Sequence, residues 1–242
     1  MPDPIYCLGD IHGQTAFLDH ALDLIEQDGG TDAEIVFLGD LVDRGPDSRG
    51  VIAALMAGQK KGRNWHVIKG NHDRMFARFV RTGDQNDARI LSGLGWMNPR
   101  LGGPATLASY GVANSADMPL DVAFQAAAAA VPEDHLAFLE GLPTSLERDG
   151  LLFVHAGILP EVPLAEQIED DLVWIRGVFH DFTAPHPWLI VHGHTALEYP
   201  EHFGNRIDLD GGAGYGRPIH PAVFEGTQCW LLTDEGRVPL TA

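Results

Sequence analysis

The sequence predicts an α/β protein, and three observations lead to this class. Short apolar runs rich in β-branched and aromatic residues recur along the chain, and several of them stop at a glycine. The first three of these runs are separated from one another by segments in which apolar residues recur at helical spacing. The chain has 242 residues, 45% of them hydrophobic, which is enough for a large core. Alternation of strands and helices is typical of a parallel sheet covered by helices.

The N-terminal part shows this alternation most clearly. Residues 4–9 (PIYCLG) and 34–39 (EIVFLG) are predicted as short buried strands, with a helix at 15–27 (TAFLDHALDLIEQ) between them. Such a strand–helix–strand unit predicts a parallel pair joined by a right-handed crossover. A second helical pattern follows at residues 48–62, and residues 64–70 (NWHVIKG) form the third predicted strand.

The middle of the chain has a different pattern. Residues 74–145 combine helical stretches with loops containing glycine and proline, and we assign the alanine run at 126–130 to a helix. Further strands are predicted at 151–157 (LLFVHAG), 188–194 (WLIVHGH), 205–210 (NRIDLD), 222–226 (AVFEG) and 229–232 (CWLL). Because no segment resembles a linker or an internal repeat, we predict a single domain, residues 1–242, with a helical insertion at about 74–145.

Composition argues against several classes of protein. The formal net charge is −18, from 34 acidic and 16 basic residues, whereas nucleic-acid-binding proteins usually carry a basic surface. No apolar run reaches the roughly 18 residues that a membrane helix needs. Two cysteines, Cys7 and Cys229, are too few for a disulfide framework, and the N-terminus lacks a signal-peptide pattern. We therefore expect a cytoplasmic protein without nucleic-acid or membrane partners.

Polar side chains follow five of the predicted strands. They are Asp10 and His12, then Asp40, Asp43 and Arg44, then Asn71, His72 and Asp73, then His155, and finally His192 and His194. In α/β proteins, sites form beyond the carboxyl ends of the strands. A single aspartate after a strand is usually a helix N-cap, and a single histidine is usually structural. Five segments that each carry such residues directly after a strand indicate a functional site instead.

This set of side chains is typical of a metal site. It contains carboxylate, imidazole and amide groups but no cysteine, which suits Mn, Fe or Zn and argues against a structural zinc. Asp10 and His12 point to the same side if their segment is extended. Asp40 can then bridge two ions with its two oxygens. Two ions about 3.5–4 Å apart can clamp a phosphate and generate a hydroxide near neutral pH. We predict two metal ions, with Mn preferred.

Five motifs resemble, in order and spacing, those of the calcineurin-like metallophosphoesterases of the phosphoprotein phosphatase family. They are GDIHG (9–13), GDLVDRG (39–45), KGNHD (69–73), HAG (155–157) and GHT (193–195). The likeness is strongest to the bacterial and phage Ser/Thr protein phosphatases and the related diadenosine tetraphosphatases. Residues 102–111 and 172–179 also resemble that branch, so the likeness covers nearly the whole chain. It implies a fold of two mixed β-sheets sandwiched between helices, with a helical insertion.

The resemblance also implies a role for each motif residue. The metal ligands would be Asp10 and His12 for the first ion, Asn71, His155 and His194 for the second, and Asp40 as the bridge. His72 would be the general acid that protonates the leaving oxygen, oriented by Asp43. Arg44 and Arg176 would hold phosphate oxygens, for which the planar guanidinium fork is suited. A metal-bound hydroxide would attack phosphorus directly, and a positioned acid contributes roughly 10²–10⁴-fold to such a reaction.

Some positions leave alternatives open. His192 and His194 lie two residues apart, so spacing alone cannot choose between them, although the family motif places the ligand at His194. Ala196 stands where nuclease-like relatives have a second histidine, which favours the phosphatase branch. For Arg206 and Tyr215, a place in the cleft and a structural role are equally compatible with the sequence.

The leading prediction is therefore a two-metal phosphomonoesterase, a Ser/Thr protein phosphatase with a phosphoprotein substrate. The alternative is a diadenosine tetraphosphatase, which would use the same metal centre on a dinucleoside polyphosphate. An inactive metal-binding scaffold is a weaker alternative, because every motif position is filled. The choice between the two substrates depends on the cleft, which the insertion at 74–145 is expected to shape.

Overall fold

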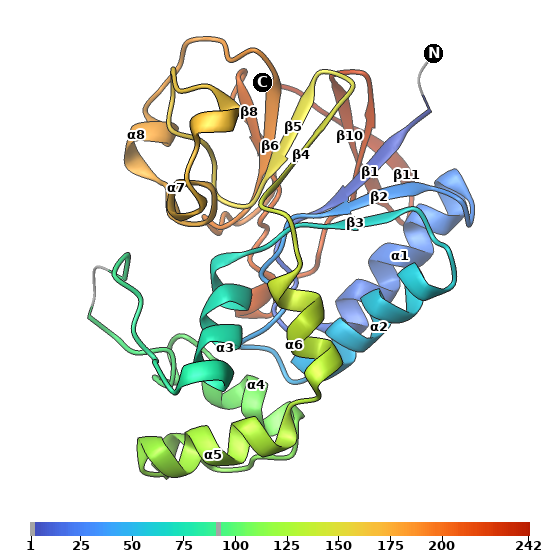
Figure 1. The fold of residues 1–242 in the computed structure, drawn as a ribbon. Helices are drawn as coiled ribbons and strands as arrows, with labels where there is room; N and C mark the ends of the chain where they lie inside the picture. Colours follow the sequence, from blue (N-terminus) through green and yellow to red (C-terminus); the bar gives the residue numbers. More distant parts are fainter. Residues whose placement is uncertain (1–2, 91–92) are drawn as a thin grey trace.

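Two β-sheets packed face to face form the centre of the computed structural model, which describes residues 3–90 and 93–242 (Figure 1). The first sheet has the strand order β11-β10-β9-β1-β2-β3, and the second has the order β4-β5-β6-β8-β7. The strands are β1 (Ile5–Leu8), β2 (Glu34–Phe37), β3 (Trp65–Val67), β4 (Ser145–Arg148), β5 (Leu151–Val154), β6 (Leu189–His192), β7 (Glu201–His202), β8 (Arg206–Asp208), β9 (Ala222–Glu225), β10 (Gln228–Thr233) and β11 (Gly236–Leu240). Both sheets are mixed, and β1 pairs in parallel with β2 as predicted.

Helices cover the outer faces of both sheets. The helices of the described residues are α1 (Thr15–Gly29), α2 (Ser48–Lys60), α3 (Asn71–Thr82), α4 (Gly103–Ser109), α5 (Leu120–Ala130), α6 (Glu133–Glu140), α7 (Glu169–Trp174) and α8 (Gly177–His180). Helices α1 and α2 pack on the six-stranded sheet, whereas α7 and α8 lie on the five-stranded sheet (Figure 1). Among the described helices, none is long and apolar enough to cross a bilayer. This arrangement confirms the predicted calcineurin-like fold.

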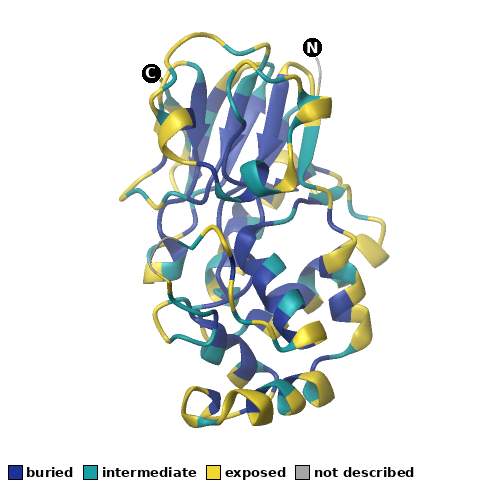
Figure 2. Ribbon diagram, turned by 60° about the vertical axis from the view of Figure 1, so that its left-hand side comes forward, coloured by how far each residue is buried: buried dark blue, intermediate teal, exposed yellow. Residues whose placement is uncertain are grey.

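The apolar runs of the sequence are explained by strands that are covered on both faces. In β1, the side chains of Ile5 and Cys7 lie in the cluster between the two sheets, whereas Tyr6 and Leu8 lie under the helices. Successive side chains of a strand point to opposite faces, so a strand covered on both sides needs a continuous apolar run. Figure 2 shows the same result as dark, buried strands surrounded by more exposed helices and loops.

The predicted insertion is helical and comprises α3 to α6. Its first helix begins at Asn71, three residues earlier than predicted, and the alanine run forms the end of α5. Phe76 of α3, Trp96 of the following loop and Leu107 of α4 belong to the same hydrophobic cluster as Phe37 of β2. The insertion thus shares a core with the six-stranded sheet, and the single-domain organisation stays a prediction.

Three strands were not predicted from the sequence. They are β4, β7 and β11, each at the edge of its sheet. Edge strands have fewer buried side chains, and β4 and β11 contain charged residues that interrupt an apolar run. Pro239 in β11 also weakens the strand pattern, since proline cannot donate a hydrogen bond and is restricted to edges.

An ion pair connects the end of α1 to β11 and leads to a pH prediction. Arg237 donates hydrogen bonds to both carboxylate oxygens of Asp28, and the Tyr6 hydroxyl donates to Asp28 at 2.7 Å. The Arg237 hydrogen bonds keep the pKa of Asp28 below its usual value. A depressed pKa stabilises the fold above the unfolded pKa of about 3.9, and this contribution is lost as the pH falls further.

Asp28→Asn is therefore expected to lower the free energy of unfolding by about 1 kcal/mol at pH 7. The difference from the wild type should shrink as the pH falls below about 4. Urea unfolding between pH 7 and the lowest pH at which both proteins fold measures this dependence. Asp32→Asn at an exposed neighbouring site is the control, and a wild-type advantage that grows on acidification would contradict the assignment.

Candidate metal centre and active site

The predicted site residues come together where the carboxyl ends of β1, β2 and β3 in one sheet meet those of β5 and β6 in the other. The loops after β1, β2 and β3 supply Asp10, His12, Asp40 and the start of α3, and the loops after β5 and β6 supply His155 and His194. The carboxylate of Asp40 lies in the middle of this arrangement. Its Oδ2 is 3.7 Å from His12 Nε2, and its Oδ1 is 3.4 Å from His155 Nε2. Asp40 thus faces imidazoles from both sheets.

The backbone around these residues is held in an unusual conformation. Five of the eight described non-glycine residues with positive φ are predicted site residues, namely His12, Asp40, Asp43, Arg44 and His194. Such conformations cost energy and are retained where the surroundings enforce them, which is common at functional sites. Here the N–H groups of Ile11 and His12 donate to the carbonyl oxygen of Asp40 at 3.1 and 2.8 Å. These bonds connect the loops after β1 and β2.

The first metal-binding group consists of His12, Asp40 and His72, which offer ligand atoms within 4.8 Å of one another. His12 Nδ1 lies 2.7 Å from the carbonyl oxygen of Val42 and must carry the proton, so the lone pair of Nε2 faces the centre. Asp10 Oδ2 is 3.7 Å from the same Nε2, although Asp10 is outside this group of three. The sequence prediction assigned Asp10 rather than His72 to this ion.

The second metal-binding group consists of Asp40, His155 and His194. His155 Nδ1 donates to the carbonyl oxygen of Leu38 at 2.8 Å, and burial lowers the pKa of His155 to about 3. Its Nε2 lone pair therefore faces Asn71 Oδ1 at 2.9 Å and Asp40 Oδ1 at 3.4 Å. Lone pairs that converge in a buried place repel one another unless a cation lies between them. The donor set therefore fits a divalent ion.

The buried carboxylates support the same conclusion. Burial raises the pKa of Asp10 and of Asp40 well above the usual value, and repulsion by Asp210 adds to the shift at Asp10. Asp208, on β8, is also buried, and its pKa is also raised by burial. These buried carboxyl groups lie close together, so they can all be ionised only if positive charge lies nearby. The sequence analysis did not select Asp208 or Asp210, because nothing in the motifs distinguishes them from turn residues.

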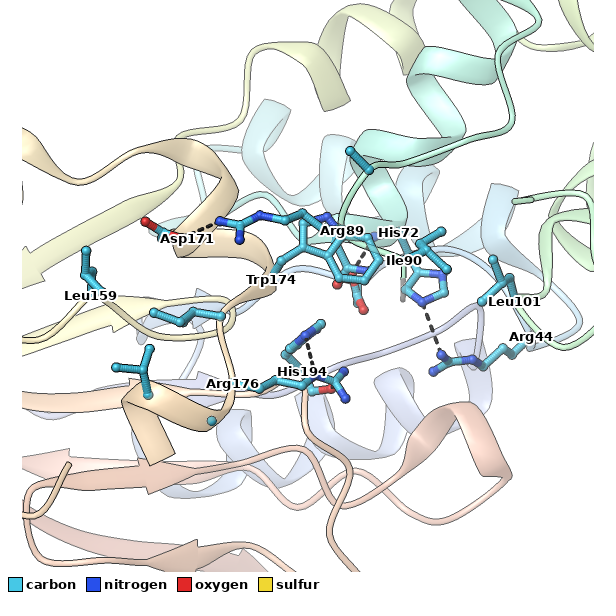
Figure 3. Close-up of a pocket in the computed structure, with 16 residues that line it drawn as sticks. Arg44, His72, Arg89, Ile90, Leu101, Leu159, Asp171, Trp174, Arg176 and His194 are labelled. Carbon is cyan, nitrogen blue, oxygen red and sulfur yellow. Dashed lines mark hydrogen bonds and ion pairs between the residues drawn. The ribbon is translucent and has the colours of Figure 1, made fainter. Parts of the chain in front are cut away.

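Two arginines lie over the imidazoles of this centre (Figure 3). Arg44 Nη1 is 2.7 Å from His12 Nε2, and its Nη2 is 3.1 Å from His72 Nε2. Arg176 Nε donates to His194 Nε2 at 2.9 Å. Neither guanidinium has a carboxylate partner among the described ion pairs. Their positions leave guanidinium donors available to an anion bound at the centre.

His72 forms a hydrogen-bonded pair with Asp43. His72 stands in the first turn of α3, and its Nδ1 is 2.5 Å from Asp43 Oδ2. Trp96 Nε1 and Thr106 Oγ1 donate to the same carboxylate at 2.8 and 2.6 Å. Burial raises the pKa of Asp43 to about 7, although both of these hydrogen bonds lower it. Burial, followed by the charge of Arg44, lowers the pKa of His72.

Trp96 and Thr106 support the Asp43 carboxylate, and the sequence analysis did not identify either of them. Both belong to the helical insertion, and Trp96 is completely buried against Phe79, with ring centroids 4.9 Å apart. A tryptophan in an apolar loop is usually a core residue, so the sequence offers no sign of its contact with Asp43. Thr106 lies in the stretch 102–111 that resembles the bacterial branch, which is the one available signal.

The structure separates His192 from His194. His192 Nε2 is 3.1 Å from Arg206 Nη1, and His192 is outside both metal-binding groups. Arg206 stacks on Phe203, with its Cζ 3.7 Å from the ring centroid, and is buried away from the centre. Tyr215 behaves differently, because it is 66% exposed and lines a cavity next to the metal-binding groups.

Two cavities open onto the centre and share Arg44, Arg176 and His194 in their walls. The larger has a volume of about 840 Å³ and is shown in Figure 3. Its wall away from the centre is formed by apolar side chains, by the Trp174 indole and by the Arg89–Asp171 ion pair. The smaller has a volume of about 360 Å³.

Comparison with known proteins agrees with this geometry. The model of the calcineurin-like phosphoesterase family matches residues 3–212. A symmetrical bis(5'-nucleosyl)-tetraphosphatase from Janthinobacterium sp. (strain Marseille) is 28% identical over 163 residues, which cover 67% of this chain and 47% of that protein. Serine/threonine-protein phosphatase 1 of Salmonella typhimurium is 34% identical over 93 residues, which cover 38% of this chain and 39% of that protein. The matches thus span less than half of either relative.

A solved structure supports the fold. The cold-active protein-tyrosine phosphatase of a psychrophilic Shewanella species superposes with a TM-score of 0.66 at 19% identity, covering 100% of this chain and 83% of that one. At this identity the likeness concerns the architecture alone. The family model covers most of the chain, and the His/Asp groups at the strand ends fit two divalent ions. The protein therefore belongs to the calcineurin-like phosphoesterases.

Proposed function

We propose that this enzyme hydrolyses dinucleoside polyphosphates such as diadenosine tetraphosphate. The observation that supports this substrate best is the pair of cavities that share Arg44, Arg176 and His194. A substrate with a nucleotide on each side of the scissile bond needs room on both sides of the metal centre. The larger cavity, with Trp174 and apolar walls, suits a nucleoside.

The curated relatives favour the same substrate. The tetraphosphatase from Janthinobacterium matches over 163 residues, whereas the Ser/Thr phosphatase of Salmonella matches over 93. The order of the two substrate classes predicted from the sequence is therefore reversed. Dephosphorylation of phosphoserine or phosphothreonine in a protein becomes the second candidate, and the likeness to the Salmonella phosphatase favours it.

The roles of the metal ligands follow the sequence motifs, and the two donor groups of the structure support the positions of His12, Asp40, His155 and His194. We assign His12 and Asp10 to one ion, Asn71, His155 and His194 to the other, and Asp40 to both. When bound, two divalent ions would polarise the phosphoryl oxygens and lower the pKa of a coordinated water. The protein itself supplies rigid strand ends and His tautomers that are fixed by backbone carbonyls, as at Val42 and Leu38.

Arg44, Arg176 and His72 act on the phosphate in this assignment. The two guanidinium groups hold the non-bridging oxygens of the scissile phosphate and oppose the charge that develops there. His72 gives a proton from Nε2 to the leaving oxygen while Asp43 fixes its orientation. In the free protein, burial and then the charge of Arg44 lower the pKa of His72. A phosphate bound to Arg44 offsets this charge, so the proton affinity of His72 rises when the substrate is in place.

The substrate is tested by comparing kcat/KM for diadenosine tetraphosphate and for a phosphoserine peptide, both with added Mn²⁺. The proposal predicts preference for the nucleotide and two molecules of ADP as the products. Strong preference for the peptide would assign the protein to the phosphoprotein phosphatases. Hydrolysis of neither substrate by the metal-loaded protein would contradict both functions.

The role of His72 is tested with leaving groups of different basicity. His72→Asn should lower kcat by about 10²–10⁴-fold for an alkyl phosphate, whose leaving alkoxide needs a proton. The loss should be smaller for p-nitrophenyl phosphate, because its leaving phenolate is stable without one. Arg49→Gln, at an exposed site away from the centre, serves as the control. An equal loss with both substrates would mean that His72 does not act as the acid.

A further inference from the structure

The smaller cavity contains more positive charge than binding of a single phosphate requires. Its walls include Arg44, Arg176, Arg217, His194, Asp210 and Tyr215. The chain has 34 acidic and 16 basic residues, and seven of its 13 arginines pair with carboxylates. Arg44, Arg176 and Arg217 have no carboxylate partner among the described ion pairs. Three guanidinium groups in one small cavity of an acidic protein therefore indicate an anionic ligand.

Arg217 is held so that its remaining donors are available. Its Nη1 donates to the carbonyl oxygen of Leu197, and its Cζ lies 5.8 Å from the ring centroid of Tyr215. The Cζ of Arg44 lies 5.4 Å from the same ring. The exposed Tyr215 ring thus stands close to both guanidinium groups and helps to fix their positions. A prepositioned arginine loses less entropy when it binds a ligand.

The cavity is lined by one carboxylate, that of Asp210, against three guanidinium groups. Asp210 Oδ1 accepts the N–H of Gly212 at 2.9 Å. No described ion pair joins Asp210 to an arginine. Arg217 lines the smaller cavity and not the larger one, so its N–H donors can contact only a ligand that enters the smaller cavity.

We propose that Arg217 binds a second phosphate, adjacent to the phosphate that Arg44 and Arg176 hold. This inference rests on the proposed function and deepens it. A phosphomonoester carries one phosphate and leaves Arg217 without a partner, whereas a polyphosphate chain extends from the metal centre into the smaller cavity. Arg217 is therefore a specificity-determining residue that favours polyphosphates over monoesters.

The experiment uses p-nitrophenyl phosphate hydrolysis in Mn²⁺ as a reporter and compares two competitive inhibitors, orthophosphate and pyrophosphate. Arg217→Gln should raise the Ki of pyrophosphate by about 10- to 100-fold, as expected for loss of a charge-assisted hydrogen bond. The Ki of orthophosphate and kcat/KM for the monoester should change by less than about twofold. Arg217→Lys should retain most of the affinity for pyrophosphate. Arg49→Gln, which changes an exposed arginine outside both cavities, is the control.

This design distinguishes failure of the inference from failure of the proposed function. All variants are measured in the same solutions, so chelation of Mn²⁺ by pyrophosphate affects them equally. An unchanged Ki for pyrophosphate in Arg217→Gln overturns the inference, and so does an equal loss for both inhibitors, which would assign Arg217 to the shared phosphate. If the wild type fails to cleave diadenosine tetraphosphate, the proposed function is wrong, but a selective loss of pyrophosphate binding still supports the second phosphate site.

Discussion

Replacing Asp40 with asparagine is expected to lower kcat/KM by about 10³-fold or more on every phosphate ester, since loss of about 4 kcal/mol of transition-state stabilisation has that effect. Asp40 faces His12 through one oxygen and His155 through the other, so its charge serves both metal-binding groups. Asparagine retains an oxygen that can accept the N–H of His72, which donates to Asp40 Oδ1 at 2.9 Å in the wild type. The variant should therefore fold while it binds metal poorly.

Thermal unfolding with and without Mn²⁺ measures the metal-binding defect independently of activity. Burial raises the pKa of Asp40, so an ionised Asp40 destabilises the metal-free fold at neutral pH. Metal-free Asp40→Asn is thus expected to be at least as stable as the metal-free wild type, but it should lose the rise in Tm on addition of Mn²⁺. Asp32→Asn, which changes an exposed carboxylate outside both metal-binding groups, should keep that rise. A wild-type metal response in Asp40→Asn would refute the bridging role.

Replacing Gly39 with alanine is expected to cause a large loss of stability. Gly39 has φ of 90°, and a Cβ at this position would lie 2.4 Å from the backbone nitrogen of Gly70. Positive φ costs about 1–3 kcal/mol for a residue with a side chain, and the clash adds a cost of similar size. We expect a loss of about 3–5 kcal/mol, and hence a fall in Tm of about 6–20 °C.

Gly111 provides a matched control for this prediction. Its φ is also 90°, but no atom lies within 4 Å of the position of its Cβ. Gly111→Ala should therefore show the cost of the backbone conformation without the clash. The difference in Tm between the two variants measures how closely the loop after β2 packs against the start of α3. If both variants unfold at the same temperature, that close approach does not limit stability.

The sequence alone was sufficient to predict the strands that supply the site. Most of these strands are buried on both faces, as β1 is with Ile5 and Cys7 on one side and Tyr6 and Leu8 on the other, whereas β3 lies at a sheet edge and is only partly buried. A continuous apolar run is a local property of the chain, and it can be recognised without knowing the neighbouring strand. The edge strands β4, β7 and β11 could not be predicted in this way, because their pairing comes from segments elsewhere in the sheet.

The sequence also determined which residues stand at the strand ends, because Gly-Asp and His motifs are local and their order follows the chain. Only the tertiary structure decided which of those residues share a centre and what supports them. It separated His194 from His192, joined Trp96 to Asp43 across 53 positions, and brought Arg217 beside Arg44. The physical reason is that ligand geometry, proton affinity and cavity charge depend on distances between segments far apart in the chain, which no local pattern records.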